Sequence, residues 1–205
     1  MLIETSRSFN RKERFYLVGK ALGNENFQLS KAFRDQLGSA IGVSVPSSAF
    51  CAMDYHLDWL YAALYLQSHD SQSTIVEDSS GNITGNQQIC VFLVSFERNT
   101  ITHLVLLEAK GATSWSNEQM RCKTERLRGI FVEDGNRFQD VKPHFLLTSP
   151  RRPKNLKEEL WPLWMRRGDD TNWFELDKWP KNPVKVTLVD PPNQLSKYWK
   201  VEPVP

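Results

Sequence analysis

The residue pair best suited to chemistry is Glu108 and Lys110, which follow a strongly apolar run, Leu104 to Leu107. In an extended strand, residues two positions apart point to the same face, so the two side chains would project together from a strand end. A carboxylate there can bind a hard divalent cation through oxygen. The neighbouring lysine can position or deprotonate a water molecule, or offset charge on a phosphate. Metal-assisted attack on a phosphodiester needs these groups and at least one further carboxylate.

Two aspartates, Asp54 and Asp58, are candidates for that further carboxylate. They lie in an apolar and aromatic segment, where a carboxylate is costly unless it is paired or bound to a metal. His56 lies between them and is either a ligand or a structural histidine. A Glu-x-Lys tripeptide alone is more typical of a surface ion pair at a strand end. The aspartates in apolar company are what favour a metal site.

The helices that would position these groups are indicated by caps and hydrophobic spacing. Ser30 is a typical N-cap for a helix over 31–41, which a glycine then ends. Ser116 and Gln119 form a capping box for a second helix that runs to about residue 128. The apolar stripe of this second helix predicts that it packs against the core.

The strands are indicated by continuous apolar runs. Two of them, 89–96 and 101–107, are separated by four residues that suit a hairpin turn. The segment 46–66 fits both a helix and a strand buried on both sides, and we favour a turn or short helix before Asp58 with a strand after it. Shorter strands are expected at 14–18, 145–148 and 184–189.

Together these elements predict an α/β fold with a central mixed sheet flanked by helices. We expect a single domain over residues 1–205, with a core at about 30–150 and a long polar loop at 67–88. Residues 151–205 are rich in proline and tryptophan, and we expect this extension to wrap and pack on the core.

Glu108-Ala109-Lys110 after an apolar strand, with an acid upstream and a polar helix downstream, resembles the PD-(D/E)XK, restriction-endonuclease-like nuclease superfamily. The resemblance covers roughly residues 30–150. It implies a restriction-endonuclease-like core of helix, three strands, helix and strand. It also implies a metal-dependent enzyme, an endonuclease or an exonuclease, that hydrolyses the phosphodiester bonds of DNA.

The resemblance further implies a site for Mg²⁺ or Mn²⁺. Asp58, Glu108 and the carbonyl of Ala109 would hold the ion, with Asp54 as the reserve for Asp58. Lys110 would orient the attacking water and stabilise developing charge.

Polar and basic residues outside this set are candidates for contact with the nucleic acid. On the second helix, Gln119 and Lys123 would contact the scissile phosphate or tune the site, and Arg126 lies on the same strip. Arg151 and Arg152 open a basic run after the last core strand. Phosphate contact is the functional interpretation of these arginines, and a solvated surface is the alternative.

A second interpretation is a non-catalytic binding or interaction protein that keeps a nuclease-like fold. The strand at 89–96 follows Gln87 and Gln88, whereas the simplest form of the motif would place an acid there. A homodimer or another protein partner that completes the site is a third possibility.

Composition sets limits on the class of protein. The chain has 205 residues, of which 40% are apolar and 24% charged, with a net charge of +2. These values suit a folded domain, and the small charge does not by itself indicate a nucleic-acid binder. No apolar run approaches about 18 residues, so we expect no membrane span. Three scattered cysteines do not make a disulfide framework, and we expect a cytoplasmic protein.

Overall fold

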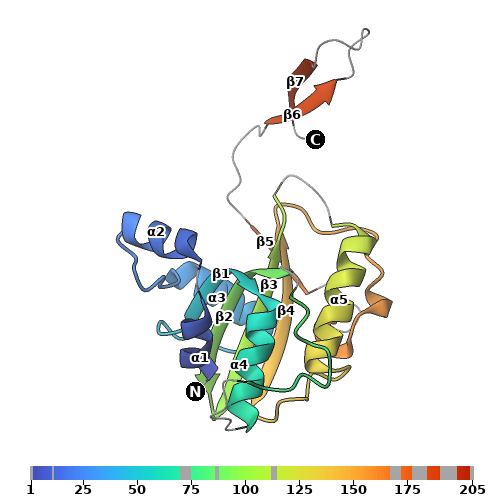
Figure 1. Cartoon of the computed structure of the whole chain (residues 1–205). Coiled ribbons are helices and arrows are strands. Elements are labelled where there is room, and N and C mark those ends of the chain that lie inside the picture. The colour runs from blue at the N-terminus through green and yellow to red at the C-terminus, as the bar shows by residue number, and fades with distance from the viewer. Residues whose placement is uncertain are drawn as a thin grey trace.

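The computed structural model describes residues 2–10, 12–69, 75–85, 88–111, 115–166, 172–176, 184–189 and 198–203. It is an α/β structure with a five-stranded mixed sheet and a separate two-stranded hairpin (Figure 1). The helices are α1 (Leu2–Phe9), α2 (Glu13–Ala21), α3 (Lys31–Ile41), α4 (Leu57–His69) and α5 (Asn117–Phe131), with 3-10 turns at Glu158–Leu160 and Leu163–Met165. The strands are β1 (Phe50–His56), β2 (Ile89–Arg98), β3 (Ile101–Ala109), β4 (Val141–Ser149), β5 (Trp173–Glu175), β6 (Val184–Val189) and β7 (Tyr198–Pro203).

The large sheet has the strand order β1-β2-β3-β4-β5, and β2 alone runs against the other four. Of the two antiparallel pairs, β2 and β3 are joined by a hairpin turn, whereas α4 and the residues after it separate β1 from β2. Parallel β3 and β4 require a longer crossover, which α5 supplies (Figure 1). The prediction of a mixed sheet flanked by helices is confirmed.

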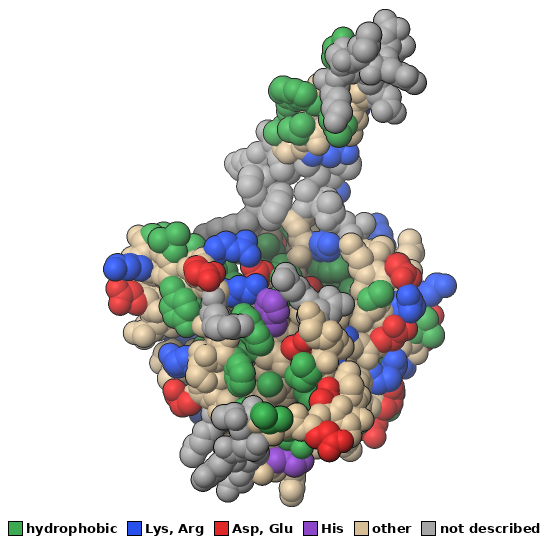
Figure 2. Space-filling model, viewed as in Figure 1, with side chains coloured by type: hydrophobic (Ala, Val, Ile, Leu, Met, Phe, Trp, Pro, Cys, Tyr) green, Lys and Arg blue, Asp and Glu red, His purple; other side chains and the backbone are tan. Residues whose placement is uncertain are grey.

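Both faces of the sheet are buried by helices. On one face, residues such as Leu93, Leu106 and Phe145 pack with the apolar sides of α1, α4 and α5. On the other face, Val94 and Val105 belong to a second cluster with residues of α3. Side chains on both faces of β2, β3 and β4 are therefore buried, which explains the nearly continuous apolar sequence of these strands. Figure 2 shows basic and acidic side chains interspersed over the visible surface of this part.

Several sequence predictions are confirmed. Ser30 Oγ accepts the Phe33 N–H at 3.2 Å to cap α3. Ser116 Oγ accepts the Gln119 N–H at 3.1 Å to cap α5. The β2–β3 hairpin also forms, and its strands are longer than predicted, so that Asn99 and Thr100 alone make the turn.

The order of elements predicted for 46–66 was wrong, because the strand comes first and the helix second. β1 pairs with β2 and buries Phe50 and Cys51 on opposite faces. The chain then turns directly into α4, where Leu57, Leu60 and Leu64 are buried at helical spacing. The strand predicted at 14–18 is likewise part of helix α2.

The C-terminal part has two sections in the described residues. The first packs on the core, since Trp161, Met165 and Phe174 are buried and β5 pairs with β4. The second is the β6–β7 hairpin, whose residues are mostly exposed. Of the polar loop predicted at 67–88, residues 75–85 form neither helix nor strand, and 70–74, 86 and 87 lie outside the described residues. Within the described ranges, no helix is long and apolar enough to cross a membrane.

Candidate functional site

Glu108 lies at the carboxyl end of the central strand β3, where the sequence pattern places it. Its side chain is 13% exposed, and Lys123 Nζ from α5 donates a hydrogen bond to its Oε1 at 2.8 Å. The Lys123 ammonium also donates to the carbonyl of Ile89 at the start of β2. Val91, opposite Glu108 in the β2–β3 register, donates its backbone N–H to the same carboxylate. Glu108 is thus held by groups from two neighbouring elements.

The electrostatic balance at Glu108 is unusual for a strand-end residue. Burial raises the pKa of the carboxyl group above its ordinary value, and the charge of Lys123, its hydrogen bond and the charge of Lys110 oppose that rise. The two ammonium charges compensate a carboxylate that is removed from water, and a metal ion could bind Glu108 only by displacing the Lys123 contact. In this structure the site holds an ion pair.

Lys110 follows β3 and lies two residues after Glu108, so it belongs to the same face by strand alternation. Its backbone N–H donates to the carbonyl of Thr148 at 3.0 Å, which extends the β3–β4 pairing to this position. The lysine is therefore attached to the sheet by its backbone.

Asp58 lies in the first turn of α4, and its carboxylate is bound by residues of α5 and of the loop 75–85. Its Oδ1 is 2.6 Å from Arg126 Nη2, and the two side chains are 14% and 10% exposed. Its Oδ2 accepts the backbone N–H of Gly85 at 2.8 Å, and Thr84 Oγ1 donates to Oδ1 at 3.3 Å. These contacts fasten the loop 75–85 to α4 and α5. Asp58 is thus paired with Arg126, and Glu108 with Lys123 one turn earlier on the same helix.

Asp54 is related to Glu108 through the register of the sheet. Its neighbours Met53 and Tyr55 pair with Phe92 and Cys90, so the residue opposite Asp54 is Val91. Val91 is also opposite Glu108, because Phe92 pairs with Leu107. Asp54 and Glu108 therefore lie on one line across β1, β2 and β3, with Cα atoms roughly 10 Å apart at the usual spacing of strands.

The backbone of Asp54 is strained, with a φ of 52° inside a strand. Residues held in this left-handed region occur mostly where surrounding structure or function requires them. Arg14 of α2 forms a 3.0 Å ion pair with the Asp54 carboxylate, which is 31% exposed. Nearby, His56 stacks on Trp59 with ring centroids 4.3 Å apart, which supports its structural interpretation.

The remaining predicted residues separate into two groups. Gln119 lies exposed in the first turn of α5, and Arg151 and Arg152 are exposed just after β4. Parallel β3 and β4 end at the same edge of the sheet, so these two arginines lie at the edge that carries Lys110. Arg126 is instead directed to Asp58 and to the carbonyl of Asn82, and its buried Nε has no hydrogen-bond partner.

Sequence reasoning missed a histidine pair on the other face of the sheet. His103 Nδ1 and His144 Nε2 lie 2.9 Å apart and share a hydrogen bond between β3 and β4. Burial, His103 and Lys142 lower the pKa of His144 to about 4. The available sequence signal was that His103 lies near the start of the strand predicted at 101–107 and His144 directly before the one predicted at 145–148.

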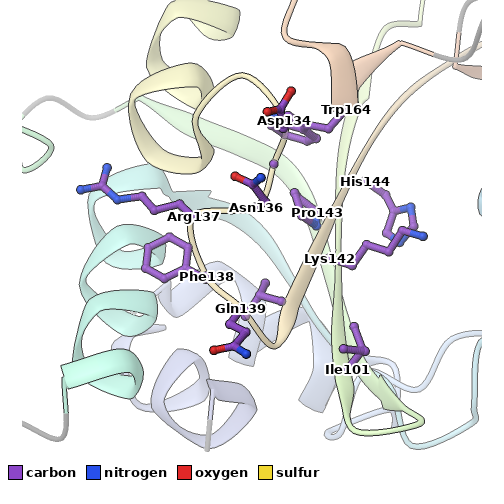
Figure 3. A pocket seen from close by; sticks show the side chains of 12 residues that line it. Ile101, Asp134, Asn136, Arg137, Phe138, Gln139, Lys142, Pro143, His144 and Trp164 are labelled. Atoms are coloured by element: carbon purple, nitrogen blue, oxygen red, sulfur yellow. The ribbon is translucent and has the colours of Figure 1, made fainter.

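A cavity of about 680 Å³ lies at the opposite end of the sheet from Glu108 (Figure 3). It is formed around the start of β4 and the loop before it, and Arg137, Lys142 and His144 are among its lining residues. None of the predicted site residues lines this cavity.

The described ranges contain no group of three or more His, Cys, Asp or Glu side chains that could together hold a metal ion. Comparison with known proteins adds no relative, because no family model, curated protein or solved structure matches the chain.

Proposed function

We propose that this chain is a metal-dependent nuclease of the PD-(D/E)XK type that hydrolyses phosphodiester bonds of DNA. The observation that carries the proposal is Glu108, a desolvated carboxylate at the end of the central strand that faces Lys110 and Lys123. The order α3, β1, α4, β2, β3, α5, β4 supports it, since the resemblance implies helix, three strands, helix and strand, to which this chain adds α4 between the first two strands.

All three candidate acids are ion-paired, Glu108 with Lys123, Asp54 with Arg14 and Asp58 with Arg126, so a divalent cation would have to displace a cationic side chain at each. Asp58 has the most contacts to lose, because the Gly85 N–H and Thr84 Oγ1 also bind its oxygens. Asp54 fits better, since it shares a cross-strand line with Glu108 and has a strained backbone. We therefore assign the ion to Asp54, Glu108 and the carbonyl of Ala109. A bound Mg²⁺ or Mn²⁺ would polarise the phosphate and lower the pKa of an attacking water.

The chain's own side chains would supply the rest of the chemistry. Lys110, fixed to the sheet by its backbone, orients the water and offsets negative charge on the phosphate. Lys123 holds the Glu108 carboxylate in one orientation. Arg151 and Arg152 lie at the same edge of the sheet, where they can contact the DNA backbone.

The activity is tested by incubating plasmid and single-stranded DNA with Mg²⁺ or Mn²⁺. We expect Glu108→Gln and Lys110→Ala each to lower the cleavage rate by about a hundredfold or more. Matched controls are Glu118→Gln and Lys31→Ala, which remove the same charges at exposed positions of α5 and α3. Equal activity in the wild type and Lys110→Ala, or no cleavage under any condition, contradicts the proposal.

The identity of the second acid is tested with Asp54→Asn and Asp58→Asn. Asp54→Asn should abolish Mn²⁺ binding by calorimetry and remove cleavage. Asp58→Asn should lower stability and still bind Mn²⁺ at a temperature at which the variant is folded. The reverse result would return the metal to Asp58.

One observation favours the second candidate, a non-catalytic binding protein with this fold. The Lys123 ammonium occupies an oxygen of Glu108 that a metal would need. Absence of Mn²⁺ binding by the wild-type chain would support this candidate, as would DNA binding that persists unchanged in Glu108→Gln.

A further inference from the structure

The β6–β7 hairpin has one entirely apolar face. The antiparallel register pairs Val186 with Val201 and Leu188 with Trp199, and residues opposite each other share a face. Val184 and Pro203 complete the same face at its end. The three rows of this apolar face are thus Val184/Pro203, Val186/Val201 and Leu188/Trp199.

This apolar face is open to solvent. Val186 is 67% exposed, Leu188 75% and Trp199 65%. Figure 1 shows the hairpin apart from the five-stranded sheet, and Figure 2 shows hydrophobic side chains gathered on it. An aromatic and several aliphatic side chains in one continuous exposed patch are the signature of an interaction surface.

The opposite face of the hairpin is polar in two of its three rows, Lys185/Glu202 and Thr187/Lys200, and its third row is Val189/Tyr198. Glu202 accepts from Lys200 at 2.6 Å, from Lys185 at 3.1 Å and from Thr187 Oγ1 at 3.0 Å. The contacts from Lys185 and Thr187 cross between the strands, the contact from Lys200 lies within β7, and all three suit a face that stays in water. The hairpin therefore has one apolar and one mainly polar face, which is the pattern of an antiparallel strand pair whose apolar face is packed against another surface.

A two-stranded hairpin with one bare apolar face is marginally stable in water and gains stability when another surface covers that face. We propose that the apolar face of β6–β7 packs against the same face of a second copy of this chain, as a two-fold interface. The face is self-complementary, since all three of its rows are apolar and none carries a charge that would meet its own copy.

The area supports this choice of partner. From the exposed fractions, each apolar face offers roughly 600 Å², so two faces would bury roughly 1,200 Å² in total, the lower end of the range for specific interfaces. Nucleic acid is a poorer match, because Lys185 and Lys200 lie on the other face and are paired with Glu202.

The test is the mass of the full chain in solution, measured by light scattering over a series of concentrations. We expect the wild type to reach twice the 23.7 kDa of one chain. Val186→Lys should raise the dissociation constant of the dimer at least roughly tenfold, because it places a charge in the interface. Thr187→Lys is the matched control, since it adds the same charge to the adjacent residue on the polar face.

A second measurement locates the contact. In a Cys122→Ser background, which removes the exposed cysteine among Cys51, Cys90 and Cys122, a short bis-maleimide should join Val186→Cys chains and leave Thr187→Cys chains unjoined. A wild type that stays monomeric, a Val186→Lys variant that is as dimeric as the wild type, or a monomer that binds lipid vesicles through this face would each overturn the proposal.

Discussion

Lys123 and Arg126 lie three residues apart on α5, and each is ion-paired with a carboxylate of a different element. Lys123 binds Glu108 of β3 at 2.8 Å, and Arg126 binds Asp58 of α4 at 2.6 Å. The four side chains are between 10% and 14% exposed. One helix thus supplies a separate cationic partner to each of two acids that the sequence pattern would place at one metal ion.

The Asp58–Arg126 pair should contribute mainly to stability. We expect Asp58→Asn to lower the free energy of unfolding by about 2–3 kcal/mol, because it leaves the Arg126 charge poorly exposed and unpaired. Arg126→Gln in the same background should cost less than it does alone. The measurement is urea denaturation of the two single variants and the double variant.

The control for this cycle is Glu118→Gln, at an exposed ion pair of the same helix. It should leave the urea midpoint unchanged, since exposed pairs contribute little. Additive effects of Asp58→Asn and Arg126→Gln would show that the pair is not energetically coupled.

Much of the sheet could be predicted because its signals are local. The apolar runs of β2 and β3 and the Ser116 cap of α5 each depend on neighbouring residues, and each prediction is confirmed. The β1–α4 segment was harder, because both elements are apolar and no capping residue separates His56 from Leu57. Because the sequence is continuously apolar, it does not show where the spacing of buried residues changes from every second residue in the strand to every 3.6 residues in the helix.

The pairing of charged groups could not be predicted for a different reason. Glu108 and Lys110 are placed by strand alternation, which is a local rule. Arg126 reaches Asp58 across 68 residues, and His103 reaches His144 across 41. Such contacts depend on the register of β4 against β3 and on how α5 lies on α4, which the local sequence does not determine.

The His103–His144 pair predicts loss of stability in acid. The pKa of His144 is lowered from 6.5 to about 4, so the folded state resists a proton that the unfolded chain takes up. The free energy of unfolding is therefore highest above pH 6.5 and decreases as the pH falls towards 4, by on the order of 2–3 kcal/mol. His144→Phe should flatten this part of the curve of unfolding free energy against pH.

The control for the histidine pair is His69→Gln, at the exposed end of α4. It should leave the acid limb of the curve as it is in the wild type. An equally steep acid limb in His144→Phe would exclude the pair as its cause.

The β2–β3 turn should be improved by one substitution. Asn99 and Thr100 have φ values of 50° and 65°, the left-handed pair of angles that a two-residue hairpin turn requires. Glycine adopts such angles freely, whereas β-branched threonine does not. Thr100→Gly should therefore raise the free energy of unfolding by about 1 kcal/mol in urea denaturation. Asn99→Gly should gain less, since asparagine tolerates this conformation, and a larger gain there would contradict the assignment.

Lys123 should compete with a metal ion for Glu108. Its ammonium bonds the carboxylate at 2.8 Å, so Lys123→Met removes both a competitor and a repelling charge. In calorimetry above neutral pH, we expect Mn²⁺ to bind at least about fivefold more tightly to this variant, since roughly 1 kcal/mol is the Coulomb energy of two unit charges about 4 Å apart even in bulk water. Arg121→Met, at an exposed position of the same helix, is the control and should bind Mn²⁺ as the wild type does. Weaker binding by Lys123→Met would mean instead that the lysine orients Glu108 for the metal, and cleavage by this variant would then fall together with its affinity.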